Sequence, residues 1–240
     1  MARVTRLLAV VAGLTVVSYP LGLSLRLPWL LPVLNTAPAY AGMVWLLRQD
    51  RRRDAVVLTL LWAVTLALCG TCTFALWAPA PDPLVLHGPA YRDEMLAWIL
   101  TGVGREGDIR QFAPQHAAHL AAFVALTLLT GSVLSMVMGA VLMNYMSFYV
   151  ASLARAGVPA SQVVLFGWQP WAICRVAAFC ILGAVLAEPL LAAVGLLGRK
   201  PLKGVRPYAL AAAGLLVLDV ILKAALAPAW GLHLRAYLGP

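Results

Sequence analysis

Forty consecutive residues, Gln115 to Ala154, contain no aspartate, glutamate, lysine or arginine, and most of them are apolar. The hydrocarbon core of a bilayer is about 30 Å thick, and a helix needs about twenty residues to cross it. The run is therefore long enough for two crossings or for one long, broken helix. Because each crossing reverses the direction of the chain, this choice decides on which side every later segment emerges.

Apolar runs of this kind recur along the whole chain, which is 62% hydrophobic and only 11% charged. Soluble domains carry about 25% charged residues. A segment surrounded by lipid must satisfy its backbone hydrogen bonds internally, and long unbroken runs favour helices over the alternating strands of a membrane barrel. We therefore expect an all-α protein, a polytopic transmembrane helical bundle in which residues 1–240 form a single integral membrane domain.

The basic clusters favour seven spans, with six as the alternative. Four arginines lie within residues 48–54, and a second cluster comprises Arg199, Lys200, Lys203 and Arg206. Lysine and arginine concentrate in cytoplasmic loops, and both clusters lie on one side only if residues 116–153 form a hairpin. We expect a plasma (inner) membrane protein with a cytoplasmic N-terminus and an external C-terminus. The predicted spans are residues 7–25, 29–47, 55–77, 116–131, 134–153, 170–197 and 207–229.

The net charge of +9 does not indicate a nucleic-acid partner, because the basic residues flank apolar spans. Such residues set topology and contact lipid headgroups. The expected partners are the bilayer and either another membrane protein or a second copy of the chain. Gly131, Ser135 and Gly139 are spaced by four and predict a close packing seam between helices.

The long connection formed by residues 78–115 holds five of the nine acidic residues and is assigned to the outer side. Within it, Pro89 to Val103 predicts an amphipathic helix, because Tyr91, Met95, Trp98 and Ile99 share one face. We expect this helix to lie at the membrane interface and to cap the bundle. An alternative role for the connection is docking of a partner protein.

Ionisable and polar residues inside the spans predict a pocket or ion pathway in the outer half of the bilayer. A charge that faces lipid costs about 2.5 to 3.5 kcal/mol, so such groups face the bundle interior or water. Asp219 and Lys223 are four residues apart and within reach of an ion pair, so purely structural pairing is the alternative. The candidate pocket residues are Asn144, Tyr145, Arg175, Glu188, Asp219 and Lys223.

Histidines and cysteines suggest a second, metal or redox hypothesis. His116 and His119 are three apart and can share one metal ion, with His87 and Glu94 as further ligands, although histidines also cap helices at a membrane interface. Cys69 and Cys72 have the spacing of a thiol–disulfide motif, but apolar surroundings disfavour the reactive thiolate, so helix packing is the alternative. A soft copper(I) lining is a further, weaker interpretation of Met136, Met138, Met143 and Met146.

The sequence contains no complete catalytic motif, such as a GxSxG elbow, a P-loop or a dinucleotide fingerprint. No cofactor is assigned, and metal or haem is the minority interpretation. The leading hypothesis is a permease-like or complex-forming membrane subunit with a polar pocket. The alternatives are a membrane-embedded metal or thiol redox enzyme and a scaffold that docks a partner through residues 78–115.

Overall fold

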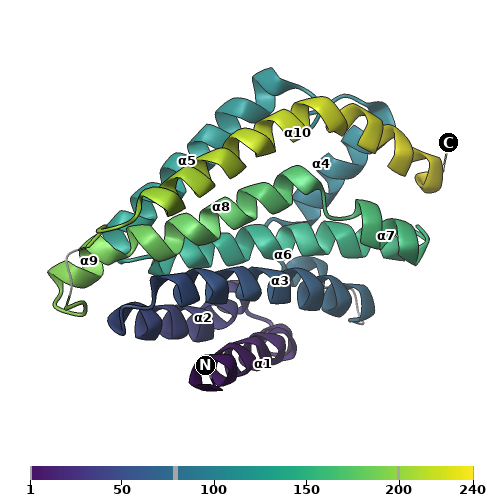
Figure 1. Ribbon diagram of the computed structural model, residues 1–240. Helices are drawn as coiled ribbons and strands as arrows, with labels where there is room; N and C mark the ends of the chain where they lie inside the picture. The colour runs from purple at the N-terminus through teal and green to yellow at the C-terminus, as the bar shows by residue number, and fades with distance from the viewer. Residues whose placement is uncertain (1, 78–80, 199–200, 240) are drawn as a thin grey trace.

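The structure is a computed structural model that describes residues 2–77, 81–198 and 201–239, and within these ranges it contains helices and no strands (Figure 1). A 3-10 turn, η1, covers Asp82–Leu84. The helices are α1 (Ala2–Ser24), α2 (Leu30–Arg48), α3 (Arg52–Leu76), α4 (Gly88–Thr101), α5 (Ile109–Thr130), α6 (Val133–Arg155), α7 (Ala160–Phe166), α8 (Pro170–Leu186), α9 (Glu188–Ala193) and α10 (Arg206–Leu238).

The long uncharged run folds as the predicted hairpin. Helix α5 ends at Thr130 and α6 begins at Val133, and the two turn residues, Gly131 and Ser132, both have positive φ. The Ser132 hydroxyl donates a 2.6 Å hydrogen bond to the carbonyl of Gly183 in α8, which fixes the turn against the bundle. Among the described residues, seven helical segments are long and apolar enough to cross a membrane.

Several boundaries differ from the prediction for local reasons. Helix α5 begins seven residues before the predicted start at 116, because the Asp108 carboxylate accepts the backbone N–H of Arg110 at 2.9 Å and caps the helix. The predicted span 170–197 is divided between α8 and α9, just before Pro189, which has no N–H to continue the ladder. Helix α10 continues through Pro228 to Leu238, and α7 was not predicted.

The helices form layers in which α3, α6 and α8 are central. Figure 1 shows α1 and α2 on one side of this centre and α5 and α10 on the other. Each long helix has a most apolar stretch, and half or more of the residues in this stretch are buried in α3, α6 and the α8–α9 segment. In α5 and α10 only 17% of them are buried. Large apolar side chains such as Leu129, Leu210 and Val217 are exposed on these outer helices. This distribution is compatible with a bundle surrounded by lipid.

At one end of the bundle, Arg52 of the first basic cluster meets Lys203 of the second, whose Arg199 and Lys200 lie outside the described residues. Arg52 at the start of α3 donates to both carboxylate oxygens of Glu188, at 2.6 and 2.8 Å, and to the carbonyl of Lys203 at 2.8 Å. We call this the basic end. The α5–α6 turn also lies there, because Gly131 is adjacent to Leu190 and Leu191. The juxtaposition of the two clusters agrees with the parity argument for a hairpin.

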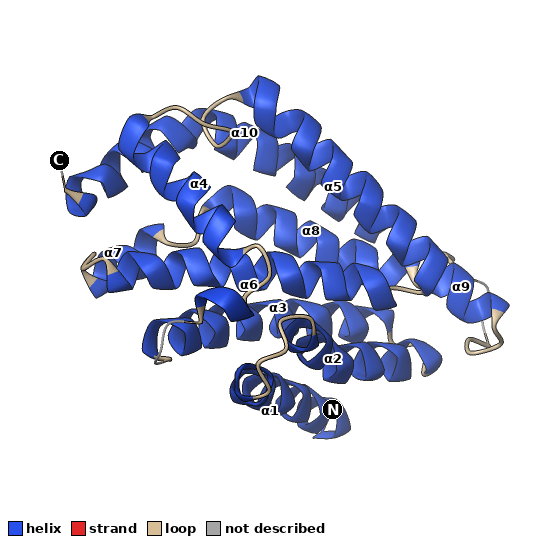
Figure 2. Ribbon diagram, turned by 180° about the vertical axis from the view of Figure 1, so that it is seen from behind, coloured by secondary structure: helices blue, strands red, loops and turns tan. Residues whose placement is uncertain are grey.

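The opposite end, which we call the α4 end, carries the helix predicted within residues 89–103. Helix α4 packs against α6 and α10, as Figure 2 shows from the back of the molecule. Met95, Trp98 and Ile99 are buried in these contacts, and Gly102 ends the helix in a left-handed conformation with a φ of 75°. The helix therefore covers this end of the bundle, and its position at a membrane interface stays a prediction.

Candidate functional site

A cavity of about 80 Å³ lies near the α4 end, between α5, α6 and α8. A water molecule needs about 10 to 15 Å³ by this measure, so the space admits a small polar group with its hydration. The lining comes from these helices, from α4, from the connection before α5 and from the connection between α7 and α8. The polar lining residues are Tyr91, Glu106, Gln115, His116, His119, Tyr145 and Arg175, and the apolar ones are Leu142, Met143, Met146, Trp168, Ala172, Val176 and Phe179.

A bidentate ion pair joins α8 to α10 beside the cavity. The Nε and Nη2 atoms of Arg175 each donate to a carboxylate oxygen of Asp219, both at 2.9 Å. The Asp219 side chain is only 2% exposed. The planar guanidinium matches the two oxygens of a carboxylate, and this geometry compensates part of the cost of removing both charges from water.

A second ion pair lies one turn further along α10. The Nζ atom of Lys223 is 2.9 Å from Oε2 of Glu106, which belongs to the connection between α4 and α5. Nζ also lies 4.7 Å from the centre of the Phe112 ring, within the range of a cation–π contact. The predicted pair between Asp219 and Lys223 is therefore wrong: each residue pairs with a partner from another segment.

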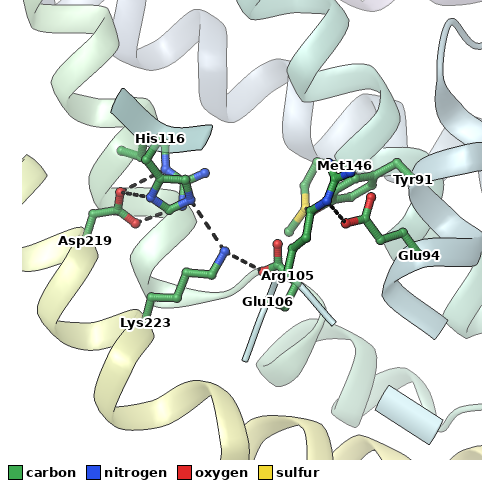
Figure 3. Close-up of polar contacts among 9 residues, drawn as sticks. Tyr91, Glu94, Arg105, Glu106, His116, Met146, Asp219 and Lys223 are labelled. Atoms are coloured by element: carbon green, nitrogen blue, oxygen red, sulfur yellow. Dashed lines mark hydrogen bonds and ion pairs between the residues drawn. The ribbon is translucent and has the colours of Figure 1, made fainter. Parts of the chain in front are cut away.

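His116 of α5 lies between Asp219 and Lys223, one member of each ion pair (Figure 3). Its Nε2 atom is 3.5 Å from Nζ of Lys223, and its Nδ1 atom is 3.4 Å from Oδ2 of Asp219, without the geometry of a hydrogen bond. An ammonium group can only donate, so Nε2 accepts from Lys223 and the ring proton belongs on Nδ1. The resulting cluster of Arg175, Asp219, His116, Lys223 and Glu106 is called the charge cluster below.

Other polar groups on the cavity wall are hydrogen-bond donors without a described protein partner. They are Nη1 of Arg175, the hydroxyl of Tyr145 and the side chains of Gln115 and His119. The Tyr91 hydroxyl donates only to the thioether of Met146, at 3.4 Å. Burial raises the pKa of Tyr91 well above its ordinary value, so this phenol stays a neutral donor. The wall therefore offers several hydrogen-bond donors to a ligand, of which Nη1 of Arg175 can only donate, while the phenol, amide and imidazole groups can also accept.

Of the candidate pocket residues, Asp219 and Lys223 do not line the cavity themselves but pair with Arg175 and Glu106, which do. Two further candidates lie elsewhere. Glu188 is fully buried at the basic end, where it pairs with Arg52, and it does not line the cavity. Asn144 belongs to a buried network in which it accepts from Tyr19 and donates to Asn35, both at 2.8 Å. This network joins α1, α2 and α6, so Asn144 has a structural role in the packing of the first helices.

The residues of the metal and redox hypothesis are only partly brought together. His116 and His119 line the cavity, whereas His87 is exposed at the start of α4 and Glu94 lies 3.5 Å from Arg105. The described part of the chain has no group of three or more histidine, cysteine, aspartate or glutamate residues placed to hold a metal ion. Cys69 and Cys72 are free thiols on α3 outside the cavity lining. Both assignments stay predictions.

Sequence reasoning missed three polar residues of the wall, Tyr91, Glu106 and Gln115. All three lie in the long connection that was assigned to the outer surface. The signal that points to Glu106 is the lysine inside a span, because a buried cation requires a carboxylate and this connection contains most of the available carboxylates.

The chain matches no family model, no curated protein and no solved structure.

Proposed function

We propose that this chain is a permease-like integral membrane protein that receives a small polar ligand in the cavity near the α4 end. The observation that carries the proposal is the position of the charge cluster. Charges are costly within the membrane, and here they converge from α5, α8, α10 and one connection on the border of a single cavity. The outer faces of the same helices are apolar.

The cavity is proposed to open to the outside. Arg48, Arg51 and Arg53 lie near Arg52 at the basic end, and the positive-inside rule assigns that end to the cytoplasm. The ion pair of Arg52 with Glu188 and its bond to the Lys203 carbonyl join α3, α9 and the following connection there. A cavity near one end and joined helices at the other correspond to the outward-facing state of a permease.

The test measures which side of the membrane reaches the cavity. The four native cysteines are replaced by alanine, and Ala172 on the cavity wall becomes the single cysteine, A172C. A membrane-impermeant methanethiosulfonate reagent is then added to right-side-out vesicles or to inverted vesicles. The matched control is A177C, on the same helix but in a groove lined by apolar residues such as Val64 and Leu68.

We expect A172C to react from the outside at least about ten-fold faster than A177C, because a thiolate forms readily only in a hydrated, polar environment. Inverted vesicles should show little reaction at either position. Equal, slow labelling of both thiols from both sides would contradict a polar cavity open to the outside. Faster labelling of A172C from the inside would reverse the proposed orientation.

A further inference from the structure

A second, apolar cavity of about 50 Å³ lies next to the polar one. The two cavities share the wall residues Leu142, Met143, Val176 and Phe179. Beyond these, the second cavity is lined by residues nearer the basic end of α5, α6 and α8, including Phe123, Met136, Gly139 and Gly183. The two cavities are therefore neighbours, one polar and near the α4 end, the other apolar and deeper in the bundle, and together they are called the recess below.

The polar part of the recess favours an oxyanion. Its unpartnered groups include several donors: Nη1 of Arg175 can only donate, and the side chains of Gln115 and His119 can donate as well as accept. The carboxylate on the described wall, Glu106, is neutralised by Lys223 at 2.9 Å. Guanidinium, imidazole, amide and phenol groups can all donate hydrogen bonds to phosphate oxygens, and Nη1 is the donor of Arg175 that Asp219 leaves free.

The apolar part favours a hydrocarbon chain. Trp62, Phe123, Met136 and Phe179 surround it, and the lining hydroxyl of Thr59 already donates to the carbonyl of Val56 at 2.9 Å. A polar ligand that extended into this part would lose hydrogen bonds to water without replacement. A single ligand that fills the whole recess must therefore have a polar head and an apolar tail.

We propose that the ligand is an amphiphile from the bilayer, with a phosphate head in the polar cavity and an alkyl chain in the apolar one. The inference rests on the proposed function, because it assigns a ligand class to the same cavity. The head accepts hydrogen bonds from Arg175, His119 and Gln115, and the chain lies along Gly139 of α6. Inorganic phosphate, which has the head chemistry alone, binds only the polar part.

Gly139 provides a way to close the apolar part without disturbing the fold. A Cβ atom at this position would meet only Trp62, at 3.9 Å, so the side chain of a leucine can enter the recess. Gly214 on α10 is the matched control, because a Cβ atom there meets nothing within 4 Å and the residue is exposed. G139L and G214L make the same substitution inside and outside the recess.

The experiment uses the purified A172C protein in detergent and measures how a ligand slows the reaction of its thiol. The probes are decyl phosphate, inorganic phosphate and decanol, so that head and chain are tested together and separately. Each methylene that leaves water strengthens binding about four-fold. We expect decyl phosphate to protect the thiol at concentrations at least about fifty-fold lower than inorganic phosphate, which corresponds to about three buried methylenes. It should also protect at lower concentrations than decanol, which has the same chain but lacks the phosphate head.

The variants separate the possible outcomes. G139L should reduce protection by decyl phosphate to the level of inorganic phosphate, while G214L leaves it unchanged. Equal protection by inorganic phosphate and decyl phosphate, insensitive to G139L, would replace the amphiphile with a free anion. Protection by decanol equal to that by decyl phosphate would remove the role of the head.

A reactive A172C thiol that no probe protects would overturn the inference and leave the proposed cavity intact. An unreactive thiol would contradict the proposed function itself.

Discussion

Replacing Asp219 by leucine will destabilise the folded protein by about 3 to 5 kcal/mol, the cost of removing one partner of a buried ion pair. The Asp219 side chain is 2% exposed and accepts both hydrogen bonds of the Arg175 guanidinium. Without the carboxylate, that guanidinium stays in the bundle with its charge uncompensated. Reversible unfolding in mixed detergent micelles measures the loss of free energy.

The control for this prediction is a double-mutant cycle with Arg175→Leu. Removing both charges at once leaves no unpaired ion from this pair, so the double variant should be more stable than either single variant. The prediction fails if the two single losses add in the double variant, because additivity would mean that the residues do not interact in the folded protein.

Replacing Arg52 by leucine will have a similar effect at the basic end, with a loss of about 3 kcal/mol. The Arg52 side chain is 10% exposed and the Glu188 side chain is fully buried. The same guanidinium also bonds the carbonyl of Lys203, so we expect backbone amides in the connection before α10 to exchange faster with deuterium. Thermal unfolding and hydrogen exchange of the reconstituted protein provide the two measurements.

Arg53→Leu is the matched control, because Arg53 is the neighbouring residue, carries the same charge and is exposed. Both substitutions remove one positive charge from the same loop and so change the topology signal equally. Equal stability of the two variants would contradict a structural role for the pair at the basic end.

The sequence was sufficient to predict the helices and the hairpin, because both depend on local composition and charge. An apolar run of forty residues has only a few ways to cross a bilayer, and the basic clusters around Arg52 and Lys203 restrict the choice further. The structure has a turn at Gly131 and brings Arg52 of the first cluster to the carbonyl of Lys203 in the second. Membrane insertion and the orientation of the termini stay predictions.

The partners of the buried charges could not be predicted from spacing. Asp219 and Lys223 are within reach of each other on one helix, but a pair between them would leave Arg175 and Glu106 without compensation. In the structure each α10 residue instead pairs across to another segment, so all four charges are neutralised. Helical periodicity describes neighbours within a helix and carries no information about contacts between segments that are far apart in the sequence.

The presence of a polar residue inside a span was also not enough to predict that its side chain lines the cavity. Arg175 and Tyr145 line it, whereas Asn144, one residue away from Tyr145, faces the first two helices and bonds Tyr19 and Asn35. Adjacent helical positions point about 100° apart, so one of two neighbouring polar residues can serve packing while the other lines a cavity. Which of them does so depends on the positions of the surrounding helices.

The position of His116 within the charge cluster is the central geometric claim, and nitrogen-15 resonances of the imidazole rings test it most directly. The protein is labelled with ¹⁵N-histidine, and the His116 signals are identified by their loss in His116→Gln. We predict a single neutral tautomer with the proton on Nδ1 and with Nε2 accepting from Lys223, and we predict that Lys223→Met shifts the Nε2 resonance. If the resonances instead show an average of the two tautomers, and Lys223→Met leaves them unchanged, the ring does not interact with the cluster and this account is contradicted.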